Sequence, residues 1–328
     1  MRSILKRAAV VALASAAGLG ASAQTAAWPT SGKTIQIIVP APGGGGTGDT
    51  IARIVADELA KTLKTSVIVD NKPGANGNIG AAAATTSDPD GYRLLFSWAG
   101  TLAVNPNLYK KLNFDPAKDF EPIGLIADVP NILVVNNDLP AKTLDEFVQY
   151  AKANPGRINF GSTGNGSSMH LAGELFMRET GTKMVHVPYA APGQATTNLI
   201  SNEIQAMFQL VPGIAGQVKA GRVRALAIMA DKRSSALPDV PTMKELGHPD
   251  LMSSTWFALL APKGTPAPIL DQLNKDLNAI LARPEVVKRL ADLGATPHAS
   301  TREQLRTHMA AETAKWGKII REANIQLQ

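Results

Sequence analysis

A glycine-rich loop near the N-terminus is the first place where the residue types could bind a ligand. Residues 43–48 read Gly-Gly-Gly-Gly-Thr-Gly, follow a predicted strand at 34–39 and precede a helical pattern at 51–63. Glycines let backbone N–H groups approach a ligand closely, and a helix N-terminus attracts an anion. The loop therefore predicts an anion site that suits a carboxylate as well as a pyrophosphate. Its candidate binding residues are Gly43, Gly44, Gly45, Gly46, Thr47 and Asp49.

Other interpretations of this loop stay open. It matches the G-x-G-x-x-G dinucleotide pattern, with Asp70 at the end of the next strand. Pro40 and Pro42 lengthen a turn that this pattern keeps tight, and the loop does not end in Gly-Lys-Ser/Thr, which excludes a Walker A loop here. The glycines could also be purely structural. Asp49 occupies the position of a helix N-cap and could in addition hold the loop N–H groups in place.

A second loop, at residues 161–168, is rich in hydroxyl groups. It reads Gly-Ser-Thr-Gly-Asn-Gly-Ser-Ser and precedes a helical pattern at 169–180. Ser167 or Ser168 with His170 could be read as part of a hydrolase triad, but the nucleophile elbow G-x-S-x-G is absent. We expect hydrogen bonds to a ligand instead. The candidate binding residues here are Ser162, Thr163, Gly166, Ser167 and Ser168.

A third segment, Ser97 to Thr101, follows a strand at 92–96 and opens at the carboxyl edge of the sheet, where α/β proteins bind ligands. Trp98 could be a floor for the ligand or a core residue. Residues 40–48, 94–107 and 161–169 carry no charged side chain. The ligand would therefore be held by backbone N–H groups, hydroxyls and helix dipoles. The candidates are Ser97, Trp98, Gly100 and Thr101.

The elements that must position these loops alternate between strand and helix, as in an α/β fold. Strands at 34–39, 66–70 and 92–96 alternate with helices at 51–63 and 80–86, which predicts a parallel sheet with helices on both faces. The unit strand, glycine loop, helix, strand recurs from residue 157, so we expect two lobes of similar architecture. The other predicted strands are 123–127, 131–135, 157–160, 183–187, 204–208, 223–229 and 255–260. The other predicted helices are 143–153, 169–180, one ending near 200, 269–281, 285–293 and 302–323.

The composition excludes several kinds of catalytic, metal and nucleic-acid-binding site. The chain has 328 residues, 45% of them hydrophobic and 18% charged, which is typical of a globular protein. It has no cysteine, which excludes disulfides, thiolate metal sites and cysteine nucleophiles. Its five histidines form no H-x-x-x-H or H-E-x-x-H pattern, so we expect neither a metal nor a cofactor. The formal net charge of +6 includes no basic run downstream of residue 7, so a nucleic-acid partner is not expected.

The N-terminus has the pattern of a secretory signal peptide. Arg2, Lys6 and Arg7 precede an apolar run at 8–19, and Ala21-Ser22-Ala23 follows. The run is shorter than the roughly 20 residues that span a bilayer, although an N-terminal anchor helix stays an alternative. We expect cleavage after Ala23, export across the inner membrane and a periplasmic location.

Short motifs along nearly all of the mature chain can be compared with known families. In the first lobe they are Pro40 to Asp49 with Ala52-Arg53, Asn71 to Ala75 with Gly77 to Gly80, Pro89 to Tyr92, Asn105 to Tyr109 and Asp119-Phe120. Further on they are Gly164 to Ser168 with His170 to Glu174, Val185 to Tyr189, Leu237 to Thr242, Ala261-Pro262 and Gly264 to Pro266. Together these motifs resemble the Bug (TctC-like) receptors, the extracytoplasmic substrate-binding proteins of tripartite tricarboxylate transporters.

The resemblance implies a two-lobed α/β fold of the type II periplasmic-binding-protein class, with the ligand cleft between the lobes. It implies a receptor that passes a small carboxylate-bearing solute to membrane permease subunits, that is not an enzyme and that we expect to be a monomer. Tyr189 and Gln209 join the binding candidates. Ala190-Ala191 replaces the usual Lys-Gly, and Gln209 replaces an Asp, so an aromatic or less polar acid is also plausible.

The domain organisation follows from this comparison. We expect residues 1–23 as signal peptide, residues 24–124 with 226–328 as the first lobe and residues 125–225 as the second lobe. The chain would cross near Gly124 and near Ala225. The alternative function is an exported hydrolase or a nucleotide-linked enzyme that uses the same glycine-rich loops.

Overall fold

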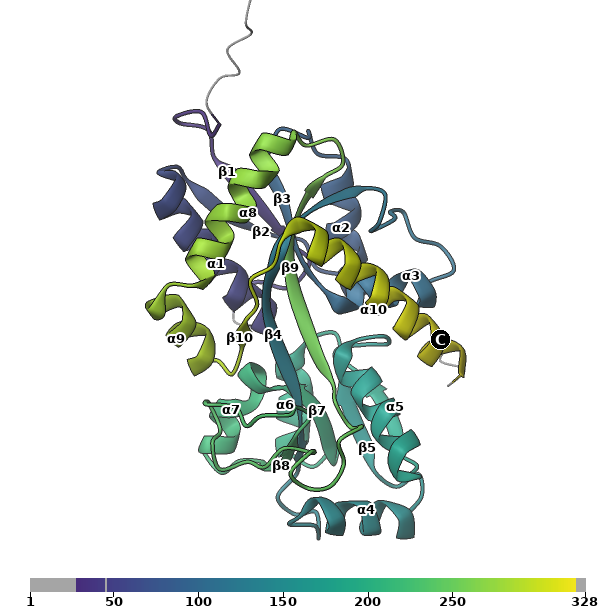
Figure 1. Ribbon diagram of the computed structural model, residues 1–328. Coiled ribbons are helices and arrows are strands. Elements are labelled where there is room, and N and C mark those ends of the chain that lie inside the picture. Colours follow the sequence, from purple (N-terminus) through teal and green to yellow (C-terminus); the bar gives the residue numbers. More distant parts are fainter. Residues whose placement is uncertain (1–27, 45, 323–328) are drawn as a thin grey trace, which may run out of the picture.

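The computed structural model describes residues 28–44 and 46–322, which form two lobes joined by long strands (Figure 1). The predicted signal peptide, its cleavage site after Ala23, and Gly45 lie outside the described residues. The chain passes between the lobes along β4 (Phe120–Val135) and β9 (Ser254–Pro262), which pair antiparallel. The two lobes therefore share a continuous pair of strands.

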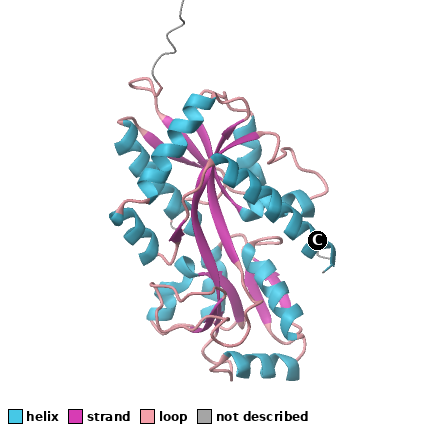
Figure 2. Cartoon of the chain, in the orientation of Figure 1, coloured by secondary structure: helices cyan, strands magenta, loops and turns pink. Residues whose placement is uncertain are grey.

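The first lobe is built on a sheet with strand order β2-β1-β3-β9-β4, in which β1 is parallel to β2 and β3. Helices cover both faces (Figure 2). The remaining strands are β1 (Ile35–Val39), β2 (Val67–Asn71), β3 (Arg93–Trp98) and the short β10 (Thr296–Pro297). The helices are α1 (Thr47–Leu63), α2 (Asn78–Thr85), α3 (Asn105–Leu108), α8 (Ala267–Leu281), α9 (Pro284–Asp292) and α10 (Arg302–Glu322). A 3-10 turn (Ala75–Gly77) precedes α2, and a π-helical turn (Gly100–Val104) precedes α3.

The second lobe repeats this plan on a smaller scale. Its parallel strands run in the order β6-β5-β7, and β7 then pairs antiparallel with the second half of β4. The strands are β5 (Asn159–Ser162), β6 (Val185–Pro188), β7 (Ala206–Leu210) and β8 (Arg224–Ile228). The helices are α4 (Leu144–Ala153), α5 (Ser168–Thr180), α6 (Pro192–Ile200) and α7 (Val211–Lys219).

Apolar residues at helical spacing explain why α1 packs where it does. Ile51, Ile54, Val55 and Leu59 lie on one side of the helix and are all buried. They join the core between the first sheet and α1, α8 and α9, while α2 and α10 cover a separate core on the opposite face. Each lobe is thus a helix–sheet–helix sandwich around two cores, as the alternating pattern predicts.

The passages between the lobes lie later in the chain than predicted. β4 pairs with β9 as far as Pro130 and with strands of the second lobe from Asn131 onward, so the first crossing is not at Gly124. β8 pairs with β4 inside the second lobe, and Leu251 still packs in a core of that lobe. The second crossing is therefore β9 rather than the strand near Ala225. Residues 223–229 and 255–260 have equally apolar patterns, and these do not reveal which strand crosses.

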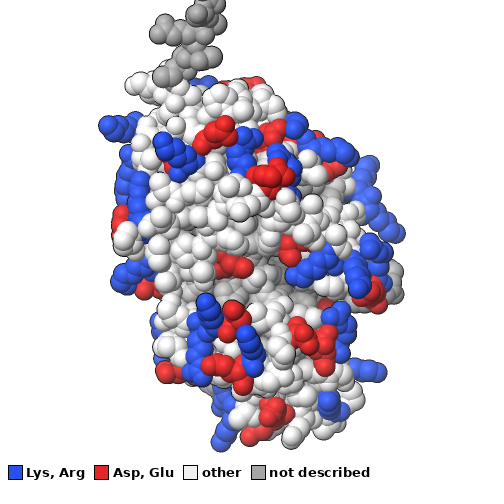
Figure 3. All heavy atoms as spheres, in the orientation of Figure 1, with Lys and Arg blue, Asp and Glu red and all other residues white. Residues whose placement is uncertain are grey.

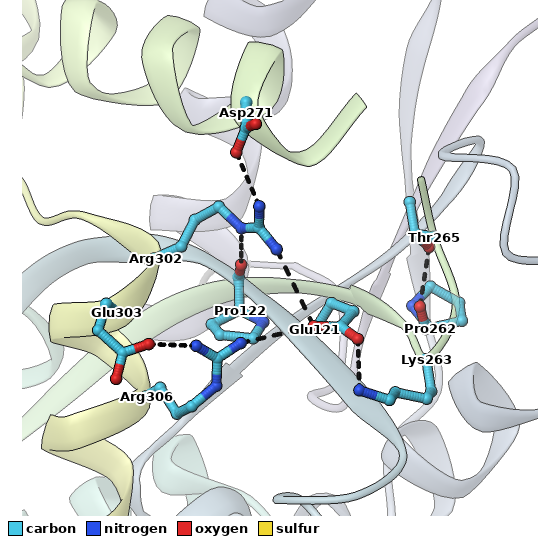
Figure 4. A network of polar contacts seen from close by, with 9 residues as sticks. All are labelled: Glu121, Pro122, Pro262, Lys263, Thr265, Asp271, Arg302, Glu303 and Arg306. Carbon is cyan, nitrogen blue, oxygen red and sulfur yellow. Dashed lines mark hydrogen bonds and ion pairs between the residues drawn. The ribbon is translucent and has the colours of Figure 1, made fainter. Parts of the chain in front are cut away.

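An ion-pair network fastens the C-terminal helix α10 to the crossing strands (Figure 4). Glu121 of β4 is only 13% exposed, and its carboxylate lies 2.6 Å from Lys263 Nζ and 3.6 Å from Arg306. Arg302 of α10 pairs with Asp271 of α8 at 2.7 Å. The network therefore connects β4 with the chain segments after β9, which lie more than 140 residues later in the sequence.

Candidate functional site

The carboxyl edges of the two sheets face each other across the crossing strands. Trp98 at the end of β3 pairs with Phe257, which pairs with Ala127 of β4. Leu210 at the end of β7 pairs with Asn131 of the same strand. Ala127 and Asn131 are four residues apart on β4, so the two sheet edges are about 13 Å apart at roughly 3.3 Å per residue. The loops that follow β1, β3, β5, β6 and β7 therefore open toward a common space.

In the first loop, Asp49 is not the helix N-cap that the sequence suggested. Gly46 is the N-cap of α1, and the helix begins at Thr47, so Asp49 lies within the first turn. Its buried carboxylate accepts hydrogen bonds from Gly44 N (3.1 Å), Arg53 Nε (3.0 Å) and Asn71 Nδ2 (2.9 Å). The second suggested role, holding a loop N–H group, is the one that the structure shows.

These hydrogen bonds also fix the charge of Asp49. Burial raises the pKa of its carboxyl group, but hydrogen bonds from Arg53, Asn71 and Gly44 outweigh burial, and the pKa lies below its ordinary value. Asp49 is therefore ionised at neutral pH, and both of its oxygens have donors from within the first lobe.

The third segment packs directly on the first loop. A Cβ atom added to Gly48 would lie 3.9 Å from Trp98 Cζ3, and one added to Gly100 would lie 3.0 Å from Trp98 Nε1. The Trp98 ring also contacts Phe257 edge-on, with 6.5 Å between the centroids. Trp98 is half-buried, so it belongs to the core and also presents surface beside the first loop.

Asn76 connects this segment with the second lobe, and sequence reasoning missed it. Its amide donates to Asn105 Oδ1 at 2.9 Å, and its carbonyl accepts from Thr101 Oγ1 at 3.0 Å. Cβ atoms added to Gly100 and Gly166 would lie 3.5 and 3.6 Å from Asn76 Nδ2. The second and third loops therefore meet at this side chain.

Hydroxyl groups of the second loop are largely engaged within the protein. Ser167 is the N-cap of α5, and its Oγ accepts from His170 N at 3.3 Å. Ser162 is fully buried, accepts from Gly164 N at 3.0 Å and lies 2.6 Å from His186 Nε2. These hydrogen bonds shape the loop, and the predicted ligand contacts of the two serines stay predictions.

Two stacked histidines lie behind the second loop. The rings of His170 and His186 are 3.9 Å apart at 15°, and His170 Nδ1 accepts from Gly166 N at 3.1 Å. Burial and the neighbouring His170 lower the pKa of His186 from 6.5 to about 3. His186 is therefore neutral at neutral pH.

This geometry does not make a hydrolase triad from Ser167 or Ser168 with His170. The Ser167 hydroxyl contacts the backbone N–H of His170, and the ring Nδ1 of His170 accepts a loop N–H. The serine that does touch an imidazole, Ser162, has no exposed surface. Within residues 28–44 and 46–322, no group of three or more His, Asp or Glu side chains could hold a metal ion.

A polar cluster lies at the facing edge of the second lobe. β5 and β7 pair at Gly161 and Met207, and β5 and β6 pair at Ser162 and Pro188. The next residues in these registers are Thr163, Tyr189 and Gln209. Tyr189 Oη accepts from Asn198 Nδ2 at 3.0 Å. Three predicted candidates, two from loops and Gln209 from within β7, thus come to the same edge.

Five buried polar atoms on or near the crossing strands lack a partner among the described residues. They are Ser97 Oγ, Asp128 Oδ1, Gln209 Nε2, Thr255 Oγ1 and His308 Nε2. Thr255 pairs with Val129, midway between the Trp98 and Leu210 rows, and was missed because nothing in an apolar strand sequence marks one threonine. Buried polar groups are nearly always hydrogen-bonded, so these atoms point to a ligand or water.

A groove of about 540 Å³ adjoins the first loop on its outer side, between α1 and α9. Its lining includes Gly44, Asp49, Arg53 and Arg289. The candidate loops contain no cationic side chain. Arg53 and Arg289 nevertheless lie close to the first loop, because they line the same groove as Gly44. Figure 3 shows cationic and anionic side chains intermixed over one face, with a recess between the lobes where uncharged residues predominate.

Comparisons with known proteins agree with this geometry. Residues 51–325 match the tripartite tricarboxylate transporter family receptor. Protein BugT of Bordetella pertussis is 38% identical over 313 residues, which cover 95% of this chain and 95% of BugT. A solved R. palustris protein with adipate is 33% identical, with a TM-score of 0.86 over 91% of this chain and 99% of that one. MatC from Rhodopseudomonas palustris with bound malate is 31% identical, with a TM-score of 0.80 over 89% and 100%.

The two-lobed α/β architecture is thus that of periplasmic binding proteins. In the part of the chain that the structure describes, no helix has both the length and the apolar character needed to cross a membrane. The motifs, the two facing sheet edges and these similarities agree, and the chain belongs to the tripartite tricarboxylate transporter family of receptors, the Bug or TctC family.

Proposed function

We propose that this protein captures a small carboxylate solute in the periplasm and delivers it to the permease subunits of a tripartite transporter. The signal peptide would direct export across the inner membrane and be cleaved after Ala23. The solute would lie between the lobes, against the first loop and Trp98 on one side and against Thr163, Tyr189 and Gln209 on the other.

The observation that carries this proposal is the meeting of the two sheet edges. Each edge presents the start of a helix, α1 or α5, preceded by a glycine-containing loop without a charged side chain. Backbone N–H groups at a helix start suit a carboxylate. Relatives of this architecture have been solved with adipate and with malate, which are both carboxylates.

A binding role also fits the chemistry better than turnover does. The serine and histidine side chains of the second loop hold that loop together through Gly164 and Gly166. A receptor needs such a rigid loop, whereas a hydrolase needs an accessible nucleophile beside a base. We therefore propose that the protein binds its solute and releases it unchanged.

Thermal unfolding with a library of mono-, di- and tricarboxylates tests the proposal. An acid at about 100 times its dissociation constant adds about 2.7 kcal/mol to the free energy of unfolding. We expect this to raise the melting midpoint by a few degrees. Chloride and sulfate at matched ionic strength are the controls.

The proposal fails if no carboxylate in the library raises the midpoint beyond these salts. The acid that gives the largest shift should also be recovered intact after prolonged incubation. Its conversion to a product would instead support the exported enzyme.

A further inference from the structure

Leu171 of α5 is buried, although it lies on the side of its helix that faces away from its own lobe. Ala172 and Phe176 belong to a core of the second lobe, and a Cβ atom added to Gly173 would lie 2.3 Å from Phe160 Cε2. At 3.6 residues per turn, Leu171 points roughly 150° away from the middle of the face that these three α5 residues form. It is nevertheless only 2% exposed. Atoms outside its own lobe must therefore cover this side chain.

The first lobe provides that cover. Leu171 packs in the apolar core that α2 and α10 enclose against the first sheet, and every other described member of this core belongs to the first lobe. Leu108 and Val104 are members too, and their methyl carbons would lie 2.3 and 3.6 Å from a Cβ atom added to Gly166. The start of α5 and the loop before it therefore dock together on the π-helical turn and α3.

A second contact of this kind lies on the other face of the first sheet. Met169 and Leu210 of the second lobe belong to the core between that sheet and α1. Because apolar side chains of the second lobe enter both cores of the first, the structure is the closed arrangement of the two lobes. The closed arrangement is thus stabilised by apolar contacts that protein atoms make with one another.

We propose that Leu171 is a latch between the lobes, a positioning residue that sets how tightly every solute binds without touching any of them. Opening the lobes returns its side chain to water, which is unfavourable for an apolar group. The apparent dissociation constant of a solute is its constant for the closed form divided by the fraction of closed molecules. Weakening the latch therefore lowers the affinity for all solutes by one common factor. The part of the inference that concerns affinity rests on the proposed function.

Spin-label distances, measured by double electron–electron resonance, test the latch without any solute. The chain has no cysteine, so Lys152→Cys in α4 and Lys275→Cys in α8 place one label on an exposed site of each lobe (Figure 1). We expect Leu171→Ala in this background to lower the share of molecules at the distance of the closed structure. Leu175→Ala is the matched control, because Leu175 lies one turn further along α5 and packs on a core of the second lobe. An unchanged distance distribution in Leu171→Ala, or an equal change in Leu175→Ala, overturns the inference.

Calorimetry with the two acids that bind the unmodified protein most tightly tests the effect on affinity. We expect Leu171→Ala to weaken both acids by the same factor, at least about fivefold, and Leu175→Ala to leave both dissociation constants within about twofold. Leu171→Met keeps the apolar volume and should retain the affinity of the unmodified protein. A purely structural role would lower the melting midpoint and leave the affinities and the label distances unchanged. Unequal factors for the two acids would show that Leu171 acts on the solute directly and would contradict the latch.

A milder variant keeps the test decisive if Leu171→Ala does not fold. Leu171→Val removes less of the side chain and should shift both measurements in the same direction by a smaller amount. No shift in folded Leu171→Val would then overturn the inference.

The outcomes separate this inference from the proposed function. If no carboxylate binds, the proposed function falls, whereas the solute-free distances still decide the latch. If acids bind Leu171→Ala as tightly as they bind the unmodified protein, the receptor stands and the latch falls.

Discussion

At the scale of single residues, the second loop depends on the pair of histidines behind it. His170 accepts the N–H of Gly166, and His186 contacts Ser162, whose hydroxyl accepts the N–H of Gly164. The rings stack at 3.9 Å, so protonating both would place two positive charges in contact. The shape of the loop should therefore be sensitive to acid.

The pKa of His186 gives a prediction for stability. The unfolded chain binds a proton at about pH 6.5, whereas the folded protein holds His186 neutral down to about pH 3. The unfolded state gains the proton first, so the free energy of unfolding should fall as the pH drops from 6.5 toward 3. Between pH 7 and pH 5 the loss should be up to about 2 kcal/mol. Urea unfolding of the protein and of His186→Asn at both pH values measures it.

The substitution His186→Asn should remove most of this pH-dependent loss, whatever it does to stability at pH 7. His248→Asn, outside the stacked pair, is the matched control and should retain the loss. An equal loss in His186→Asn and in the unmodified protein would show that this histidine does not cause it.

The sequence predicted where the glycine-rich and hydroxyl-rich loops lie, whereas the hydrogen-bond partners of their side chains could not be predicted from it. The types of Ser162 and Ser167 predicted contacts to a solute, and the structure adds that each hydroxyl has a partner within the second lobe, which residue type does not reveal. Asn76 and Thr255 carry no local signal, because only their tertiary neighbours give them a role. Which polar group remains free is decided by packing and cannot be read from residue type.

At the scale of elements, the second loop is wedged against the π-helical turn and α3 of the first lobe. Gly166 has φ +78°, and a Cβ atom there would lie 2.3 Å from Leu108 Cδ2. Gly164 has φ +110° but has open space around its Cβ position. A substitution at Gly164 would therefore strain only the backbone, whereas one at Gly166 would also disturb the contact between the lobes.

We expect Gly166→Ala to destabilise the protein by about 1–3 kcal/mol more than Gly164→Ala does. Both substitutions strain the backbone, but the first also forces Leu108 to move. Thermal unfolding of the two variants gives the comparison. Equal losses in the two variants would mean that Leu108 does not restrict residue 166. If Leu108 does restrict it, adding Leu108→Ala to Gly166→Ala should relieve the extra loss.

Two elements show why element boundaries were harder to predict than element types. The two strands predicted at 123–127 and 131–135 are one strand, β4, because β9 pairs with its first part and β7 with the rest. α7 was not predicted, because Pro212 and two glycines are poor helix formers. Pro212 lies in the first turn, where its missing N–H costs nothing.

At the scale of the whole molecule, the two lobes touch on both sides of the crossing strands. Gly166 packs on Leu108, and a Cβ atom added to Gly294, after α9, would lie 2.4 Å from Val211 of α7. A solute that lies between the lobes needs a route in. We therefore predict that the lobes separate by a hinge in β4 and β9 when the site is free.

Small-angle X-ray scattering should detect this motion. We expect the radius of gyration to be smaller in the presence of a saturating acid than in its absence, because a bound solute favours the closed form. Binding is confirmed separately by calorimetry on the same sample. An unchanged radius with saturated binding would indicate a rigid, preformed pocket.

The two-lobed plan itself was predictable, because the repeated unit of strand, glycine loop and helix requires two parallel sheets. The path of the chain between the lobes was not. Local patterns fix which residues form strands, whereas the choice of the crossing strand depends on long-range pairing of β4 with β8 and β9. The predicted lobe limits at 124 and 225 therefore do not match the crossings.

The central claim is that one carboxylate solute is held by both lobes. A crystal structure with the acid that most stabilises the protein tests it most directly, through the positions of the ligand oxygens. We predict one carboxylate within hydrogen-bond distance of N–H groups in residues 43–48, and the other end of the solute against Thr163 or Gln209. Solute density confined to one lobe, or found in the outer groove between α1 and α9, would contradict the account.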